Sequence, residues 1–294
     1  MRNKVLAEGK VLTMKYPSIK KAVLPIAGLG TRFLPLSKAF PKELWPLLDR
    51  PVIDYIVEEV KDSGAKEVIF VVSPEKKILR DYFKPNPKME KVLRERGKLD
   101  LLKELKEGEK RWQKLSFSFV LQRRPLGDGH AIRLSRKIVG REPCMVSFGD
   151  DLVVSKTPCL LQLARVFQKY GQPVIALKRV PREKVSLYGT VAVKKIGPKL
   201  YQIQKIVEKP KMAKAPSNLV IVGKYILTPE VFNYLEKAKP SFRGEIILAE
   251  TFKKMIEDGK MIYGCEFEGQ WLECGNPRDW LKSNLSLAKK LKLF

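Results

Sequence analysis

Glycine and basic residues follow a short apolar run near the N-terminus. The run Ala22–Ala27 leads into a turn that contains Gly28 and Gly30. Arg32 and Lys42 come next along the chain. Glycine allows backbone N–H groups to approach a phosphate closely, and cationic side chains supply further donors to a polyphosphate. These residue types in this order predict a phosphate-binding loop at the end of a strand.

Three other interpretations of the glycine turn differ in their ligands. A P-loop ends in Gly-Lys-Ser/Thr, which is absent here. A dinucleotide-binding turn has a third glycine where this chain has Phe33, and Pro35 breaks any helix that would begin there. A bare Gly-x-Gly is also common in tight turns that bind nothing. The two glycines alone therefore leave the ligand open.

Carboxylates come directly after a second apolar run. Residues 144–148 form a predicted buried strand, and Asp150 and Asp151 follow it. In open parallel sheets, ligands bind at the carboxyl ends of the strands. We therefore expect these carboxylates to share one edge of a sheet with the glycine turn.

Strand and helix patterns alternate between these residues. Pro51 opens a helix whose apolar face ends before Gly64, and residues 66–73 form the next strand. This strand–helix–strand order predicts an α/β protein with a largely parallel sheet. Further strands are expected at 115–122, 173–178, 189–193, 201–208, 219–227 and 261–266, and further helices at 75–114 (broken by Pro85 and Pro87), from 131, and at 160–170, 229–237, 245–258 and 277–290.

Composition argues against several protein classes. The 294 residues are 44% hydrophobic, enough for one large domain or two small ones, and contain no apolar run of 18 residues that could span a membrane. The N-terminal segment lacks the unbroken apolar stretch of a secretory signal, so a cytoplasmic protein is expected. None of the four cysteines forms a Cys-x-x-Cys pair, which argues against a zinc site. His130 is the single histidine, so a Ser-His-Asp triad would require it as the base.

The net charge of +26 raises the question of nucleic-acid binding. The basic residues are spread along the chain, and the densest region, residues 84–114, interleaves them with six acidic residues. Such mixing is typical of a solvated helix pair. Polyanionic substrates account for part of the excess charge. We expect no specific nucleic-acid partner and no membrane partner, but non-specific adhesion to RNA or DNA at low salt.

The stretch around the glycine turn resembles a known family. GLGTRFLPLSKAFPKELWPLLDRPVIDY is similar to the start of the sugar-phosphate nucleotidyltransferases, and nearest to the bacterial-type uridylyltransferases that act on UTP and glucose 1-phosphate. The residues that carry this resemblance are Gly28, Gly30, Thr31, Arg32, Pro35, Pro41, Lys42, Glu43 and Pro51. Five further stretches follow in the family's order: LQRRPLGDGHAI, SFGDDLV, VSLYGTV, EKPKMAKAPSNLVIVGKYILTPEVF and GEIILAETF. The last two favour the uridylyl branch.

The resemblance covers residues 20 to about 288 and implies an architecture. It implies a three-layer α/β/α Rossmann-like nucleotidyltransferase fold with a mixed, mostly parallel central sheet. It leaves residues 1–19 as an N-terminal extension and assigns residues 20–294 to the nucleotidyltransferase domain. Within that domain, 20–155 would be the nucleotide-binding half and 156–294 the sugar-phosphate-binding half. A homo-oligomer, either a dimer or a tetramer, is also implied.

The implied reaction is Mg²⁺-dependent transfer of a uridylyl group from UTP to glucose 1-phosphate, which gives UDP-glucose and pyrophosphate. Such an in-line displacement needs two polyanions to be aligned and their charge neutralised. Four residues are implied as catalytic: Arg32 on the leaving pyrophosphate, Lys42 near the α-phosphate, Asp150 on the metal and Lys209 on the sugar phosphate. The nucleotide would be bound by Ala27, Gly28, Gly30, Thr31, Gln122, Gly127 and Asp151.

The sugar and metal sites follow from the same resemblance. The sugar would be bound by Gly189, Glu208, Lys209 and Val222. The relatives often carry an acidic metal ligand in an Asp-Cys-Gly or Asp-Thr-Gly context, where this chain has Glu273. Its extra methylene puts direct Mg²⁺ ligation in question, so Asp150 is the main expected ligand. Asp151 would contact ribose or cap a turn.

Several alternatives stay open at this point. The base could be thymine instead of uracil, or the sugar phosphate could differ. A catalytically weak regulatory homologue is disfavoured because Arg32, Lys42 and Asp150 are all present. For His130 we expect a residue at a helix start that is satisfied by the backbone, because a phosphate nucleophile is already ionised and needs no base.

Overall fold

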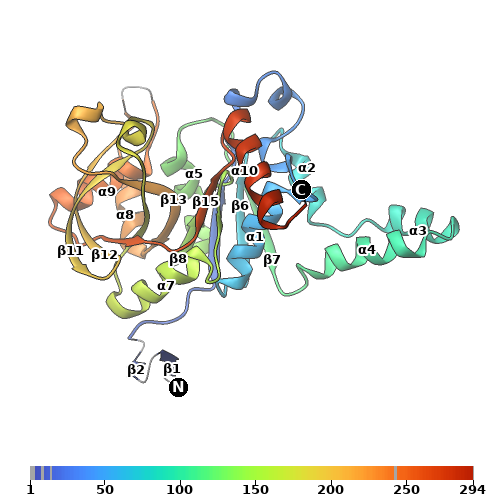
Figure 1. Cartoon of the computed structure of the whole chain (residues 1–294), viewed down its shortest axis with the longest axis horizontal. Helices are drawn as coiled ribbons and strands as arrows, with labels where there is room; N and C mark the ends of the chain where they lie inside the picture. The colour runs from blue at the N-terminus through green and yellow to red at the C-terminus, as the bar shows by residue number, and fades with distance from the viewer. Residues whose placement is uncertain (1–3, 8–9, 14, 242–243, 294) are drawn as a thin grey trace.

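The computed structural model describes residues 4–7, 10–13, 15–241 and 244–293 of the chain. A nine-stranded sheet runs through the molecule (Figure 1). Its strands, in spatial order, are β10 (Val174–Arg179), β14 (Tyr263–Glu266), β12 (Leu200–Val207), β11 (Thr190–Gly197), β13 (Leu219–Leu227), β8 (Cys144–Ser147), β3 (Lys21–Pro25), β6 (Glu67–Val72) and β7 (Ser116–Leu121).

The sheet is mixed, and most of its strands point the same way. β3 is parallel to both β6 and β8, and β6 is parallel to β7. β13 is antiparallel to β8 and to β10, whereas β10 and β14 are parallel. Only β12 and β13 therefore oppose the other strands of this sheet. β10 and β11 both pair with β13, so that β13, β10, β14, β12 and β11 close into a ring.

Helices cover both faces of the sheet, as the alternation of buried side chains along each strand requires. On one face, Leu24 and Phe70 pack with α1 (Val52–Asp62), α7 (Cys159–Tyr170) and α10 (Pro277–Lys290). On the other face, Val23 and Ile69 pack with α5 (Asp128–Leu134), α8 (Pro229–Lys237) and α9 (Leu248–Glu257). The expected three-layer α/β/α fold is confirmed.

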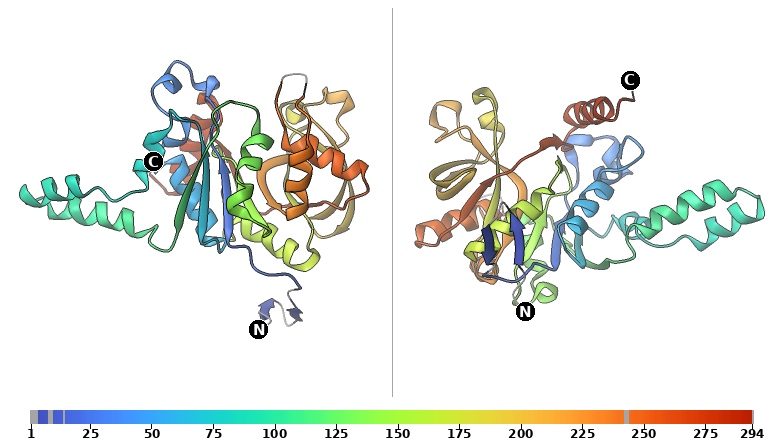
Figure 2. Two further views of the ribbon diagram at one scale, coloured as in Figure 1. Left: turned by 180° about the vertical axis from the view of Figure 1, so that it is seen from behind. Right: turned by 60° about the horizontal axis from the view of Figure 1, so that its bottom comes forward.

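The predicted helical segment 75–114 is three helices. They are α2 (Lys77–Tyr82), α3 (Pro87–Glu95) and α4 (Leu99–Lys110). The predicted break at the two prolines separates α2 from α3, and a second break, at Gly97 with its positive φ, separates α3 from α4. Figure 2 shows α3 and α4 reaching away from the sheet as an arm. Among the described side chains of the arm helices, Leu102 alone is buried. The solvated helix pair expected from the charge pattern is therefore confirmed.

Smaller elements complete the chain. They are β1 (Lys4–Ala7), β2 (Lys10–Thr13), β4 (Pro46–Leu47), β5 (Arg50–Pro51), β9 (Asp151–Val154), β15 (Gln270–Glu273), and α6 (Arg136–Val139). None of these smaller elements was predicted, and the helix expected at 245–258 begins three residues later. The extension expected at 1–19 lies partly outside the described residues. In the described part of the chain, no helix is long and apolar enough to cross a membrane.

Candidate active site

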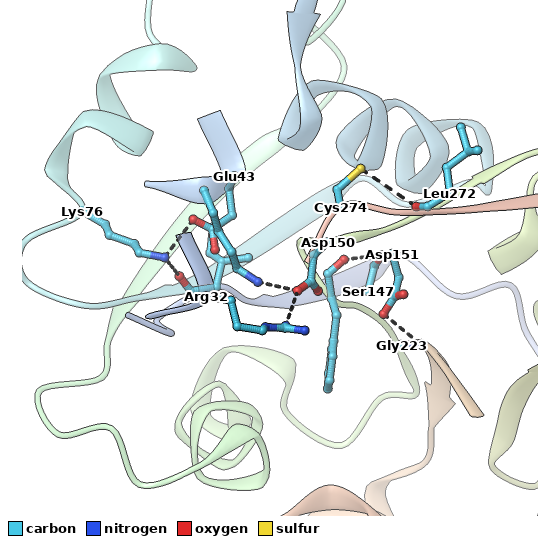
Figure 3. A network of polar contacts seen from close by, with 12 residues as sticks. Arg32, Glu43, Lys76, Ser147, Asp150, Asp151, Gly223, Leu272 and Cys274 are labelled. Atoms are coloured by element: carbon cyan, nitrogen blue, oxygen red, sulfur yellow. Dashed lines mark hydrogen bonds and ion pairs between the residues drawn. The ribbon is translucent and has the colours of Figure 1, made fainter. Parts of the chain in front are cut away.

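The glycine turn follows β3 and is fixed from below by a buried ion pair. The Lys76 Nζ donates to the Ile26 carbonyl oxygen at 2.7 Å and to the Glu43 Oε2 at 2.8 Å. Glu43 is 1% exposed, and the Lys76 side chain is 8% exposed. Burial lowers the pKa of Lys76, which the Glu43 carboxylate opposes. The Glu43–Lys76 pair (Figure 3) therefore ties Ile26, which precedes the glycine turn, to the segment that carries Lys42.

Asp150 brings two predicted cations together. Its carboxylate accepts a hydrogen bond from the Lys42 ammonium and lies 3.4 Å from the Arg32 guanidinium (Figure 3). Burial opposes both charges in the Lys42–Asp150 pair. Their attraction outweighs it, so the pKa of Asp150 falls below 3.8 and that of Lys42 rises above 10.5. Both side chains are therefore charged at neutral pH. The Arg32 side chain is 64% exposed and free to turn toward a ligand.

Asp151 is held differently from its neighbour. Its Oδ1 accepts from the Trp271 indole N–H at 2.8 Å, and its Oδ2 accepts from the Gly223 backbone N–H at 3.2 Å. Burial and the nearby Asp150 raise the pKa of Asp151 to about 7. A Cβ at position 223 would collide with the Asp151 carboxylate, so only glycine allows this approach. Both the cap and the ribose contact predicted for Asp151 remain untested.

Glu273 lies across from Asp151 because β9 and β15 pair antiparallel, with these two residues opposite each other. Both oxygens of Glu273 accept from the Tyr188 hydroxyl, at 2.8 Å each. Burial raises the pKa of Glu273, which the bond from Tyr188 opposes. The unpredicted pairing of β9 with β15 therefore brings Glu273 next to the predicted carboxylates Asp150 and Asp151.

A cavity of about 280 Å³ connects these groups. Of the predicted residues, it is lined by Arg32, Asp150, Asp151, Gly189, Glu208, Lys209 and Glu273. Gly189 approaches the Glu208 carboxylate so closely that a Cβ there would lie 3.0 Å from Oε2. Val222 is different, because its side chain is 1% exposed and packs in the core. Its neighbours Ile221 and Gly223 line the cavity instead.

A second cavity of about 370 Å³ lies beside the glycine turn and is lined by Thr31, Lys42 and Lys76, among others. Ala27, Gly28 and Gly30 precede Thr31 in that turn. The predicted phosphate-binding loop thus has an open space on one side. Most of the predicted charged side chains, however, line the first cavity, near 280 Å³ in volume.

Gln122 and Gly127 meet each other at the start of α5. The Gln122 Nε2 donates to the Gly127 carbonyl oxygen at 3.0 Å and lies 2.9 Å from the His130 Nδ1. His130 is therefore satisfied by a side chain, and the expected backbone partner was wrong. A Cβ at Gly127 would collide with the Ile246 carbonyl oxygen, so packing alone already requires a glycine there. Contacts of these residues with a base remain a prediction.

The donor set at the cavity suits a hard cation. In the described part of the chain, no group of three or more His, Cys, Asp or Glu side chains could hold a metal by itself. Mg²⁺ characteristically takes only one or two protein carboxylates and completes its shell with phosphates and water. Asp150 and Glu273, which line the same cavity, match that requirement.

Four residues of this site were missed from sequence. They are Lys76, Tyr188, Gly223 and Trp271, which position the loop, Glu273 and Asp151. Tyr188 and Gly223 lie in VSLYGTV and VIVGKYIL, so proximity to a predicted residue was an available signal. Trp271 is likewise two residues from the predicted Glu273. Lys76 acts through contacts made across the fold, and nothing local to its sequence marks it.

Comparison with known proteins agrees with this geometry. A family model described as nucleotidyl transferase matches residues 21–290. The UTP–glucose-1-phosphate uridylyltransferase of Staphylococcus haemolyticus (strain JCSC1435) is 40% identical over 272 residues, which cover 92% of this chain and 93% of that protein. The UTP–glucose-1-phosphate uridylyltransferase of Bacillus subtilis (strain 168) is 37% identical over 274 residues, which cover 93% of this chain and 92% of that protein.

Solved structures give the same result. A UDP-glucose pyrophosphorylase complexed with UDP-glucose aligns with a TM-score of 0.81 at 34% identity, covering 92% of this chain and 99% of that one. A UTP-bound UGPase from Acinetobacter baumannii aligns with a TM-score of 0.84 at 34% identity, covering 92% and 94%. With a family model that spans nearly the whole chain, and relatives that match along nearly all of theirs, this chain belongs to the nucleotidyl transferase family.

Proposed function

We propose that this protein is a UTP–glucose-1-phosphate uridylyltransferase, which forms UDP-glucose and pyrophosphate. The observation that carries the proposal is that Asp150, in contact with Lys42 and Arg32, lines a cavity that Glu208 and Lys209 also line. The cations beside Asp150 suit a polyphosphate and a metal, and Glu208 and Lys209 suit a sugar phosphate. The uridylyltransferases that match along the chain support the assignment.

The reaction is a displacement at the α-phosphorus of UTP. A phosphate oxygen of glucose 1-phosphate forms the new P–O bond, while the bond to the β-phosphate bridging oxygen breaks and pyrophosphate leaves. Lys42 would neutralise charge near the α-phosphate, and Arg32 would turn toward the leaving pyrophosphate. Because the nucleophile and the leaving group are both ionised, alignment and charge neutralisation are the main requirements of this site.

The remaining contacts divide between the two substrates. We assign the nucleotide to Ala27, Gly28, Gly30, Thr31, Gln122, Gly127 and Asp151, and the sugar phosphate to Gly189, Glu208, Lys209 and the backbone of Val222. This assignment corresponds to the proposed nucleotide-binding half at 20–155 and sugar-phosphate-binding half at 156–294. The Lys209 ammonium suits the sugar phosphate, and the Glu208 carboxylate suits sugar hydroxyls.

Mg²⁺ is the proposed metal, with Asp150 as its first ligand and Glu273 as the second or as a partner through water. When bound, it would neutralise phosphate charge between the two substrates. The Tyr188 hydroxyl contacts both carboxylate oxygens of Glu273. Shortening the Glu273 side chain therefore moves its carboxylate away from Tyr188. Glu273→Asp should shift the Mg²⁺ concentration needed for half-maximal activity. An unchanged Mg²⁺ titration would place Glu273 away from the metal.

The direct test is product formation by the purified protein with Mg²⁺, UTP and glucose 1-phosphate. We expect UDP-glucose and pyrophosphate in equal amounts, a higher rate with UTP than with dTTP, and reversal on addition of pyrophosphate. Absence of UDP-glucose with all three present would overturn the proposal, and equal rates with UTP and dTTP would overturn the base assignment. A cytoplasmic location and a dimeric or tetrameric assembly accompany the proposal as predictions.

A further inference from the structure

Asp128 is a carboxylate in the cavity wall that has no role so far. It is the first residue of α5 and lines the cavity together with Glu208 and Tyr225. The glycines on either side of it, Gly127 and Gly129, pack against Ile246, which leads into α9. The start of α5, which carries Asp128, is therefore fixed against the segment that leads into α9.

The two oxygens of Asp128 have different surroundings. Oδ1 accepts from the Gly129 N–H at 2.6 Å and from the Leu248 N–H at 3.0 Å. Among the residues that the structure describes, none donates a hydrogen bond to Oδ2 or forms an ion pair with it. One oxygen thus anchors the side chain to the starts of α5 and α9, and the other is available to a ligand in the cavity.

The charges around Asp128 indicate what kind of ligand fits. Burial and the nearby Glu208 raise its pKa, which the two backbone hydrogen bonds oppose. Asp128, Asp151, Glu208 and Tyr225 all line this one cavity. A phosphate placed among three carboxylates would be repelled. A neutral group that donates hydrogen bonds, such as a sugar hydroxyl, would be bound.

We propose that Asp128 is a specificity-determining residue whose Oδ2 accepts a hydrogen bond from one hydroxyl of the sugar phosphate, beside a second hydroxyl that donates to Glu208. The inference rests on the proposed function and assigns a residue that neither the motifs nor the resemblance singled out. It also predicts that the two carboxylates read different hydroxyls of one sugar ring.

Asp128→Asn separates this role from the structural one. Asparagine keeps an Oδ1 acceptor for the two backbone N–H groups and replaces Oδ2 by an amide that cannot accept. Glu245→Gln is the matched control. Like Glu208, Glu245 raises the pKa of Asp128, but unlike Glu208 it does not line the cavity. Both variants lose one negative charge in the same neighbourhood.

Steady-state kinetics of the whole chain provides the test. For Asp128→Asn we expect KM for glucose 1-phosphate to rise about tenfold or more, as for a lost hydrogen bond to a charged group. We expect kcat and KM for UTP to stay within about twofold, and Glu245→Gln to leave all three unchanged. A thermal melt of each variant confirms that it is folded.

Deoxy analogues of glucose 1-phosphate identify the contact. For the analogue that lacks the hydroxyl bound by Asp128, the wild type and Asp128→Asn should have the same KM, and the other analogues should keep the difference. An unchanged KM for glucose 1-phosphate in Asp128→Asn, or a rise in KM for UTP instead, would overturn the inference. Those outcomes leave wild-type activity intact, whereas failure of the proposed function removes it.

Discussion

Single charges control the chemistry of this site. Asp150 is ionised because Lys42 and Arg32 offset the cost of its burial, whereas its neighbour Asp151 faces an indole and a backbone amide and has a pKa of about 7. These two adjacent carboxylates thus differ in pKa because their partners differ. The one that stays ionised is the one suited to a cation.

Replacing Asp150 by asparagine tests its role directly. Asp150→Asn removes the anion that two cations and the proposed metal share, so we expect turnover to fall by at least about a hundredfold. The fold should survive, because asparagine has the same shape and still accepts from Lys42. Initial rates of UDP-glucose formation and a circular dichroism spectrum measure both. Activity that remained dependent on Mg²⁺ at near the wild-type rate would contradict the ligand role.

Asp150→Asn also tests how the stability of the folded protein depends on pH. In the folded protein the pKa of Asp150 lies below the ordinary value of 3.8. Its contribution to stability is therefore present above that value and is lost as the pH falls through 3.8 toward the folded-state pKa. Asp150→Asn has no such contribution to lose. The stability gap between wild type and variant, from urea unfolding at about pH 6 and about pH 3, should narrow in acid. A gap independent of pH would contradict the depressed pKa.

At the scale of elements, the site depends on connections that cross the sheet. The paired strands β9 and β15 bring Asp151 and Glu273 opposite each other. Lys224 on β13 is fully buried, pairs with Glu59 of α1 at 2.8 Å and donates to Ser147 of β8 at 3.0 Å. The turn after β8 is therefore tied to both β13 and α1. Element ends, more than element interiors, place the functional groups.

The buried Glu43–Lys76 pair should stabilise the protein through the glycine turn. Lys76→Met leaves the Glu43 charge buried and unpaired, so we expect a loss of about 3 to 5 kcal/mol in unfolding free energy. Adding Glu43→Leu should restore part of it, because the double variant leaves no uncompensated charge. Urea denaturation measures each variant.

Lys84→Met is the matched control for that experiment, because the Lys84–Asp81 ion pair is 58% and 69% exposed. Such a pair contributes about 0 to 1 kcal/mol. A loss in Lys76→Met no larger than in this control would show that the buried pair does not hold the turn.

On the scale of the whole molecule, the chain forms a body, which is the nine-stranded sheet with the helices that cover it, and the arm of α3 and α4. The body buries two apolar layers, one on each face of the sheet. The arm of α3 and α4 projects from one end and carries exposed apolar residues such as Met89, Leu99 and Leu101. Its base is narrow, because the Asn86 backbone N–H lies 3.0 Å from the Glu109 carboxylate.

Removing the arm should leave the body folded and active. Replacing residues 87–108 by a short glycine–serine linker removes one buried side chain, Leu102, among those described in α3 and α4. We expect the melting temperature to fall by less than about 5 °C and the UDP-glucose rate to stay within about twofold. Loss of folding or of activity would show that the arm belongs to the core or to the site.

Much of the body could be predicted from sequence because its signals are local. Buried strands such as β6 are continuous apolar runs, and helices such as α1 carry an apolar stripe between a proline and a glycine. β9 and β15 were missed because each pairs with a strand that is far away in the sequence, which no local pattern reveals. The helix from 245 was placed early because Asp128, far away in sequence, accepts from Leu248 at the start of α9.

The residues of the candidate site also differ in whether a local sequence pattern reveals them. Gly28, Gly30, Arg32, Lys42, Asp150 and Asp151 could be predicted from residue type and spacing, and the resemblance to a family added residues such as Gln122, Glu208 and Lys209. What only the tertiary structure decided is which charges meet: that Lys76 lies under the turn, that Gly223 and Trp271 hold Asp151, and that Asp128 faces the cavity. A local pattern fixes the conformation of neighbouring residues, but a contact between distant residues depends on how strands pair and helices pack.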